Sequence, residues 1–346
     1  MDVDANFIDE KAAAVHALGN IGLFCSGLIL PRLTEVVKVL SEIGDYFHEN
    51  IRYHVCQTYL QIGVGIMRHF TGFDEKFPWE KGLPVKKALP NQVNEYLDQV
   101  VFPHYFNIFE TDDNKEVIEK TLECLREMCE VLGPGAIASH SDRLVEVLLA
   151  LLDKKAFCQT HGQGGGEKDG EMDEDEDGDD GFKDEDEEED DDEDDEDLDH
   201  DEIILGNTTD VISELAHALG DQFLLYFTKI GPSLVRYLDD SHPRSDIVMV
   251  IGCLAETFSA CTAAIPVYFK DFLHILLKNA KTDDSSLNRN IAYAIGILAQ
   301  HSGVLLGQHL QPCLEALSAM YASSEEKEAK DNVISASCRV MQSYPT

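Results

Sequence analysis

A recurring helical pattern is the feature that most limits how this chain can fold. Seven stretches open with polar residues and then carry small and apolar residues at helical spacing, as Ile247, Val250, Ile251 and Leu254 do at i, i+3, i+4 and i+7. Equivalent positions in the seven stretches are Leu18, Leu60, Leu125, Leu219, Leu254, Ile295 and Cys338. The uninterrupted spacings between them are 42, 35, 41 and 43 residues, a period typical of a two-helix solenoid repeat.

A second type of helix lies between these stretches. It is richer in leucine and often near a proline, as in "LPRLTEVVKVLSEIG" and "SDRLVEVLLALLDKK". We call the two types the small-residue helices and the leucine-rich helices. No alternation typical of strands occurs, so the sequence predicts an all-α fold: an α-solenoid of about six HEAT repeats, built from antiparallel helix pairs stacked into a superhelical arch.

The predicted organisation is a single array over residues 1–346, cut from a longer one. It is expected to begin on the second helix of a repeat and to have an exposed apolar edge there. Two longer spacings, 65 and 94 residues, interrupt the period. An irregular inter-repeat loop at residues 70–92 accounts for the first. A disordered acidic insertion at residues 162–204, between the two helices of repeat three, accounts for the second.

The charge of the chain is concentrated in that insertion. The formal net charge is −39, and residues 167–202 hold 27 acids and two lysines. Such a run favours Lys/Arg-rich partners over nucleic acid or anionic membranes. We expect it to act as an electrostatic tether through residues such as Asp184, Glu187, Asp190, Glu193 and Asp197; the alternative is a loop that only aids solubility.

Several functional classes find no support in the sequence. No apolar run is long enough for a transmembrane helix, and the first residues do not resemble a signal peptide. Nine cysteines without a CxxC pair indicate reduced thiols. The thirteen histidines show no HExxH motif, and neither a Walker loop nor a GxSxG motif is present. We therefore predict no enzyme, no cofactor and no metal site; the calcium-loop-like "DEDEDGDDGFKD" is best explained by chance in so acidic a run.

The second helices of the repeats are expected to line the concave face, where polar residues in their early turns meet a bound basic peptide. Carboxylates suit lysine ammonium groups, and asparagine side chains can hold a peptide backbone. For each residue singly, helix capping is the competing explanation, for example in a capping box formed by Ser323 and Glu326. The candidate cargo-binding residues are Asp210, Glu214, Asp246, Asn288, Asn290, Glu325, Glu326, Asp331 and Asn332.

The stretches "DEKAAAVHALGNIG", "NRNIAYAIGILAQH" and "EEKEAKDNVISASCRVM", with a long acidic insertion inside one repeat, resemble the importin-β (karyopherin-β) family of nuclear transport receptors, most closely its C-terminal HEAT repeats. The resemblance implies a receptor that shuttles between cytoplasm and nucleus through nucleoporin-lined pores and releases basic cargo to Ran-GTP. It implies histones H3 and H4, possibly with a histone chaperone, and ribosomal proteins as cargo. It also implies that the asparagines of "NRN" and "KDN" are peptide contacts. Because the family grips Ran with N-terminal repeats that this chain lacks, we expect cargo binding without the full release cycle.

Two other functions stay open at this point. A HEAT-repeat scaffold for folded proteins would have apolar, salt-tolerant interfaces. An acidic histone chaperone would share the charge argument but would have no transport role.

Overall fold

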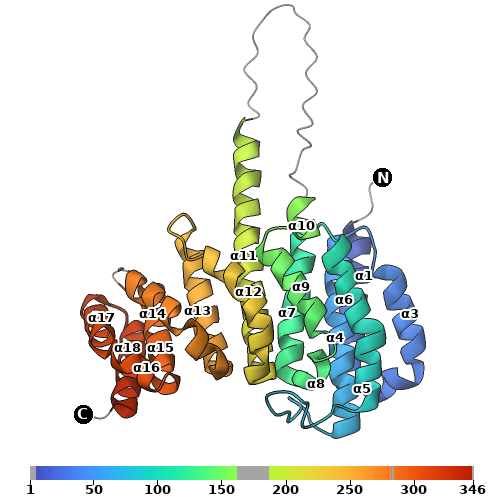
Figure 1. Cartoon of the computed structure of the whole chain (residues 1–346). Helices are drawn as coiled ribbons and strands as arrows, with labels where there is room; N and C mark the ends of the chain where they lie inside the picture. Colours follow the sequence, from blue (N-terminus) through green and yellow to red (C-terminus); the bar gives the residue numbers. More distant parts are fainter. Residues whose placement is uncertain (1–4, 162–186, 281, 283, 345–346) are drawn as a thin grey trace, which may run out of the picture.

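The computed structural model of the chain describes residues 5–161, 187–280, 282 and 284–344, with the backbone alone at 5–6 and 187–200. The described residues form helices and no strand, arranged as a curved double layer (Figure 1). This confirms the predicted α-solenoid. The small-residue helices are α1 (Ala5–Phe24), α4 (Glu49–Thr71), α7 (Lys115–Leu132), α11 (Glu187–Leu219), α13 (Arg244–Ala260), α15 (Ser285–His301) and α18 (Lys327–Ser343).

The leucine-rich helices make the second layer. They are α3 (Leu33–Ile43), α6 (Phe102–Thr111), α9 (Ser141–Leu152), α12 (Leu224–Arg236), α14 (Ile265–Asn279) and α17 (Leu310–Ser323). Each follows a short turn of helix or an irregular segment that reverses the chain. These short elements are α2 (Ser26–Ile29), η1 (Leu30–Arg32), α5 (Asn91–Tyr96), η2 (Leu97–Val101), α8 (Pro134–Ile137), α10 (Phe157–Thr160), η3 (Gly220–Phe223), η4 (Thr262–Ala264) and α16 (Val304–Gly307).

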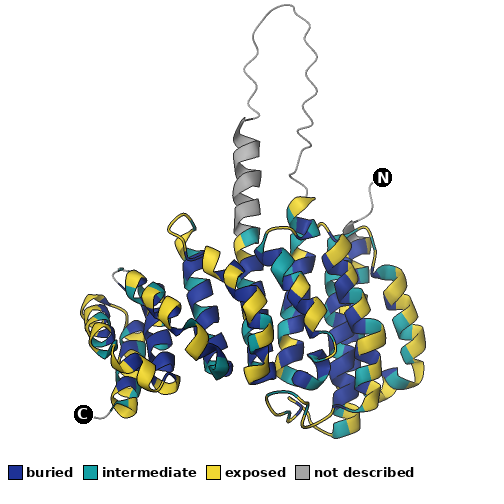
Figure 2. Cartoon of the chain, viewed as in Figure 1, coloured by how far each residue is buried: buried dark blue, intermediate teal, exposed yellow. Residues whose placement is uncertain are grey.

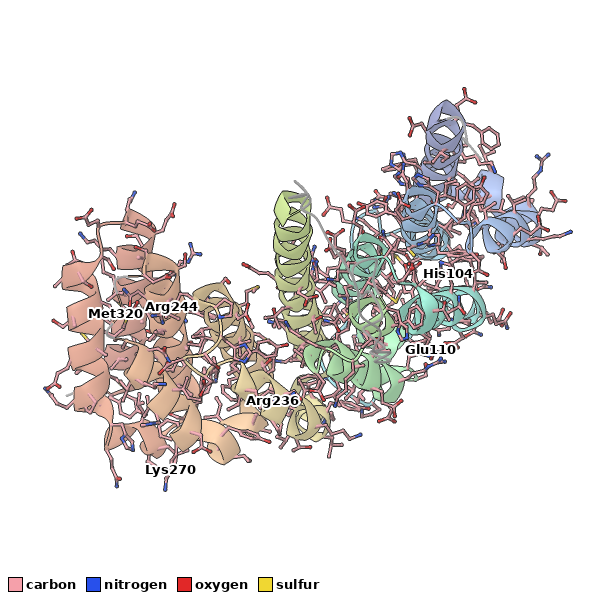
Figure 3. The ribbon with its side chains drawn as sticks, turned by 90° about the horizontal axis from the view of Figure 1, so that it is seen from above. His104, Glu110, Arg236, Arg244, Lys270 and Met320 are labelled. Carbon is pink, nitrogen blue, oxygen red and sulfur yellow. The ribbon has the colours of Figure 1, made fainter. Side chains whose placement is uncertain are left out.

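The two layers pack differently. Each small-residue helix makes its most extensive contacts with a neighbouring small-residue helix, from α1 through to α18, whereas neighbouring leucine-rich helices touch less. Small residues allow this close approach: a Cβ on Gly65 of α4 would lie 1.9 Å from the backbone oxygen of Gly22 on α1. The closely packed row is the inner layer of a curved array. Seen from above, Glu110, Arg236 and Lys270 of the leucine-rich layer lie along the opposite, outer side (Figure 3).

The core is continuous from one end of the array to the other, so buried residues run through every repeat (Figure 2). Large apolar side chains are exposed at the first helices, among them Phe24 and Leu28, each 71% exposed. Apolar side chains are as exposed elsewhere in the array, for example Leu225 (71%) and Val304 (89%), so this exposure is not confined to the first helices. All nine cysteines are unpaired, and seven of them are buried. Within the described residues, no single helix is long and apolar enough to cross a membrane; two pairs of helices bent by 110° and 106° meet the length and composition requirement only jointly.

The segment between α4 and α5 crosses the ends of several helices. The Phe77 amide donates to the Val131 carbonyl (3.0 Å) and the Trp79 indole to the Glu130 carbonyl (2.9 Å), both on α7. Further on, the Gly82 amide donates to Ala218 at the end of α11 (2.8 Å), and the Lys81 ammonium to Ala260 at the end of α13 (2.8 Å). Residues 72–90, which we call the strap, therefore join helices of three successive repeats. Trp79 thus fastens this segment to α7.

The acidic insertion is only partly described. Residues 162–186, including Asp184, lie outside the described residues. Helix α11 begins at Glu187, so its backbone carries Glu187, Asp190, Glu193 and Asp197. The helix thus starts earlier than the predicted boundary at residue 204. The packed part of the helix begins near Ile204.

Candidate functional site

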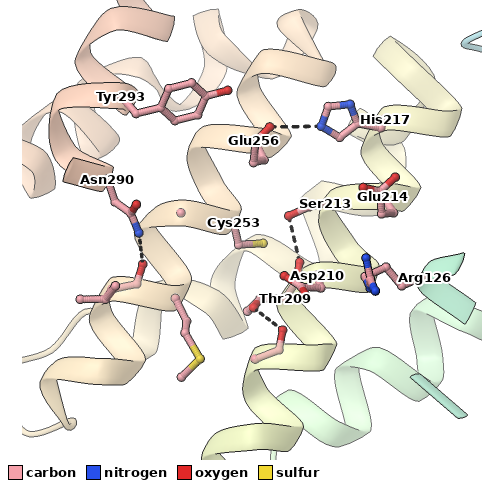
Figure 4. Close-up of a pocket in the computed structure, with 14 residues that line it drawn as sticks. Arg126, Thr209, Asp210, Ser213, Glu214, His217, Cys253, Glu256, Asn290 and Tyr293 are labelled. Atoms are coloured by element: carbon pink, nitrogen blue, oxygen red, sulfur yellow. Dashed lines mark hydrogen bonds and ion pairs between the residues drawn. The ribbon is translucent and has the colours of Figure 1, made fainter. Parts of the chain in front are cut away.

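A groove opens on the inner layer between α11 and α13, bounded by α7 and α15 (Figure 4). Its volume is about 680 Å³. We call it the acidic groove. Its lining residues are Arg126, Gly206, Thr209, Asp210, Ser213, Glu214, His217, Val248, Met249, Gly252, Cys253, Glu256, Asn290 and Tyr293.

Two carboxylates of α11 face the groove without an ion-pair partner. Asp210 and Glu214 are one helical turn apart, so their charges lie on the same face. Among the described residues, neither carboxylate forms an ion pair, that is, a contact of 4.0 Å or less with a Lys, Arg or His nitrogen. Partial burial raises the pKa of both carboxyls; Arg126 opposes that rise at Asp210, and His217, Lys76 and Arg126 oppose it at Glu214. The groove therefore presents two carboxylates whose negative charge is only partly offset by neighbouring groups, and both can accept hydrogen bonds from a cation.

A third carboxylate, Glu256 of α13, is already engaged. Its Oε2 lies 3.2 Å from Nε2 of His217 on α11. The hydrogen bond to Glu256 raises the pKa of His217, and the same bond lowers the pKa of Glu256. The pair connects two repeats across the groove and leaves Asp210 and Glu214 as the available acids.

The far wall is formed by α15. Nδ2 of Asn290 donates to the Val248 carbonyl on α13 (2.9 Å), which orients the side chain and leaves Oδ1 able to accept a further hydrogen bond. One turn on, Tyr293 is half-buried, and the Arg339 guanidinium lies 5.4 Å from the centre of its ring. A polar acceptor beside an aromatic ring can hold a peptide backbone and the aliphatic part of a long side chain.

The structure brings together three of the nine predicted cargo-binding residues: Asp210, Glu214 and Asn290. The prediction that Asn288 contacts cargo is corrected, because this residue is 1% exposed and its Nδ2 donates to the Thr282 carbonyl (3.0 Å). Two residues along a helix correspond to about 200° of rotation, so Asn288 and Asn290 point to different sides. Asp246 is only 9% exposed and lines a different cavity.

The remaining four predicted residues lie near the start of α18. Glu325 and Glu326 are exposed in the turn before that helix, Asp331 is exposed within it, and Asn332 is half-buried. None of the four lines the acidic groove.

The alternative of a capping box at this start of α18 is wrong. Glu326 is the N-cap residue but makes no capping hydrogen bond. The Ser323 hydroxyl instead donates to the Met320 carbonyl of the preceding helix (3.3 Å).

Among the ionisable and aromatic residues of the groove, apart from Cys253, sequence reasoning missed Arg126, His217, Glu256 and Tyr293. Two of them carried a usable signal, because His217 follows Glu214 by three residues and Tyr293 follows Asn290 by three, which places each pair on one helix face. Arg126 and Glu256 come from other repeats, and no local spacing connects them to α11. No group of three or more His, Cys, Asp or Glu side chains in the described ranges is arranged to hold a metal ion.

Comparison with known proteins agrees with this architecture. A family profile described as "Importin subunit beta-1-like, TPR repeats" matches residues 198–345. Human Importin-4 is 25% identical over 351 residues, covering 99% of this chain and 29% of its own length. The "Probable importin subunit beta-4" of Schizosaccharomyces pombe is 24% identical over 341 residues, covering 99% of this chain and 30% of its own length. The chain therefore spans less than a third of these relatives.

Solved structures show the same fold. The crystal structure of Kap121p aligns with a TM-score of 0.69 at 13% identity, covering 100% of this chain and 30% of Kap121p. A structure described as Kap121p bound to RanGTP aligns with a TM-score of 0.67 at 12% identity, covering 98% of this chain and 28% of that one. At this identity the likeness concerns the fold.

Proposed function

This chain is a member of the importin-β family, and from that premise we propose that it forms part of a nuclear transport receptor whose acidic groove binds lysine-rich segments of protein cargo. The family consists of transport receptors and not of enzymes. The observation that carries the proposal is a pair of carboxylates without an ion-pair partner, the exposed Asp210 and the half-buried Glu214, which line an open groove together with Asn290.

The groove has the chemistry that an extended basic peptide needs. A lysine ammonium can approach Asp210 and Glu214 as its counter-charge, while Oδ1 of Asn290 accepts from a peptide amide. The ring of Tyr293 can pack against the aliphatic part of a lysine side chain. Because the contacts are charge-assisted and partly exposed, affinity is expected to fall with ionic strength.

The wider partners are proposed by analogy with the relatives. Kap121p structures are described as bound to RanGTP, to Pho4p and to Nup53p. We propose that the whole protein to which this chain belongs binds Ran-GTP and nucleoporins and shuttles between cytoplasm and nucleus. Histones H3 and H4 and ribosomal proteins are the proposed cargo, because their lysine-rich segments match the groove.

The acidic run is proposed to assist without providing the specific site. Residues 167–202 carry 27 acids, and the run leads into α11, the helix that also carries Asp210 and Glu214. With a Debye length of about 8 Å at physiological ionic strength, it acts on partners already near the array. Its removal should slow association more than it weakens the final complex.

The test is titration of the chain with a histone H3 amino-terminal peptide. Replacing Asp210→Asn and Glu214→Gln together should raise Kd about tenfold at low salt and reduce its salt dependence. The matched control is Asp142→Asn with Glu146→Gln, an exposed pair of acids with the same spacing on the outer helix α9.

An unchanged Kd for the groove variant, or equal losses in both variants, would rule out the groove as the cargo site. Binding that is insensitive to salt would instead favour a scaffold with apolar interfaces. Cargo release by Ran-GTP from the full-length protein would distinguish a transport receptor from a histone chaperone.

A further inference from the structure

A second cavity is lined by residues at the base of the acidic run. Figure 1 shows where α11 enters the double layer. It has a volume of about 250 Å³ and is separate from the acidic groove. Its walls come from the end of α9, from α11, and from the turn between α12 and α13. Asp201 and Glu202, the last acids of the run, stand at its edge.

The cavity contains polar acceptors that lack donors. The Thr208 hydroxyl is buried without a hydrogen-bond partner in a residue that is 1% exposed. Oε1 of Gln159 is also buried and unpartnered, although its Nε2 donates to the Leu151 carbonyl (3.3 Å). Buried oxygens of this kind are costly unless a donor reaches them.

A carboxylate with little compensation completes the set. Asp246 is 9% exposed, and the ion-pair partner that the described residues provide for it is Nδ1 of His242 at 3.6 Å, a group that is charged only when protonated. Burial raises the pKa of Asp246, and His242 and Lys154, which also line the cavity, oppose that rise only in part. Asp201 differs, because Lys115 and Lys154 each lie 3.3 Å from one of its oxygens. Asp246 is therefore the buried carboxylate of this cavity, and it has no lysine or arginine in an ion pair among the described residues.

An arginine side chain can donate hydrogen bonds to these acceptors. Its planar guanidinium carries five N–H donors and is less strongly hydrated than an ammonium group, so one group can reach a carboxylate, a hydroxyl and an amide oxygen together. The aliphatic part of the side chain would pass along the apolar walls formed by Leu152, Leu205 and Pro243.

We propose that this cavity binds the side chain of one arginine in the cargo and so anchors a basic segment at the base of the acidic run. The inference rests on the proposed function, from which it takes its source of arginine. It adds a site of different specificity: the acidic groove is open and suits lysines, whereas this cavity is narrower and selects a flat, multi-donor cation.

The experiment uses a probe too short to depend on the groove. An N-acetylated, amidated tripeptide with arginine between two alanines is titrated into the chain, and the methyl resonances of Leu152 and Leu205 are followed by NMR. The same tripeptide with citrulline in place of arginine has nearly the same shape without the charge. Saturable shifts with arginine and at least about tenfold weaker binding of citrulline are expected, because the charge-assisted bond to Asp246 is lost.

Variants locate the effect. Asp246→Asn should abolish the preference for arginine over citrulline, and Thr208→Val should weaken arginine binding about threefold or more. Asp142→Asn, an exposed acid in the first turn of α9, is the control for the helix position of Asp246 and should change nothing. The groove variant Asp210→Asn with Glu214→Gln should also leave tripeptide binding unchanged.

Equal shifts with both tripeptides would mean a water-filled polar cavity and would overturn the inference, as would unchanged arginine binding in Asp246→Asn. The proposed function is tested separately by the histone peptide and the groove variant. If the groove variant leaves histone-peptide binding unchanged while the arginine tripeptide still binds as expected, only the groove is refuted. If the groove variant weakens histone-peptide binding but the tripeptides show no preference for arginine, only the arginine cavity is refuted.

Discussion

Replacing Gly65 by alanine is expected to destabilise the array, although alanine is the better helix former. Gly65 lies in the middle of α4, where α1 crosses it at close range. An alanine Cβ would stand 1.9 Å from the Gly22 carbonyl oxygen, 2.8 Å from its carbon and 3.2 Å from Leu23 Cα. All three atoms belong to the backbone, so no side chain can turn aside to make room.

The magnitude follows from two opposing contributions. Helix propensity favours alanine over glycine by about 1 kcal/mol. Relief of the clash requires the Gly22 carbonyl to retreat by more than about 1 Å, and a gap of that size removes a quarter to a half of the dispersion attraction between the facing side chains. Overpacking costs about 1–3 kcal/mol when side chains can adjust, and here a whole helix has to move. We therefore expect a net loss of about 2 kcal/mol.

The assay is urea denaturation followed by circular dichroism, with hydrogen exchange over α1 as a local measurement, because solenoids can unfold from one end. Gly63→Ala is the matched control: it lies on the same helix and is also buried, but its Cβ would lie 3.5 Å from the Tyr96 ring, an ordinary contact. That variant should gain about 0.5–1 kcal/mol. The reasoning fails if Gly65→Ala is as stable as Gly63→Ala, or if α1 exchanges no faster.

Two further predictions concern the strap and the groove. Trp79→Ala should lower the free energy of unfolding by about 2 kcal/mol, since the half-buried indole packs on Gly133 and donates to the Glu130 carbonyl; a thermal midpoint equal to that of the wild type would show that the strap is not a brace. His217→Gln should flatten the pH dependence of stability above about pH 6.5, the pKa of a free histidine. Because the folded protein raises the pKa of His217, protonated His217 stabilises the fold fully below about pH 6.5, and this stabilisation is lost as pH rises through the folded-state pKa. Since His217 and Glu256 are about two-fifths exposed, the effect should stay below about 1 kcal/mol, and urea midpoints at pH 6 and pH 8.5 that change equally in wild type and variant would contradict it.

The candidate site was predictable only in part, and the asparagines of α15 show why. Residue types and helical spacing predicted polar residues of the small-residue helices as contacts for a ligand, and Asp210, Glu214 and Asn290 do line one groove, whose binding of a ligand stays a prediction. Asn288 meets the same local criteria, yet it is buried, because the rotation of α15 about its axis is set by packing against α13 and α18. The local sequence of α15 does not specify this rotation.

By itself, the sequence determined the helix types, their period near 40 residues, the number of repeats and the position of the acidic insertion. These depend on spacing along the chain, which is a local property. Only the tertiary structure decided which side chains share a cavity: it brought Glu256 to His217 across two repeats, and it separated Asp246 from the groove. The reason is physical. Neighbouring helices meet at angles and distances fixed by backbone approach, as between Gly22 and Gly65, and by long-range ties such as Lys81 to Ala260, neither of which is encoded within a single repeat.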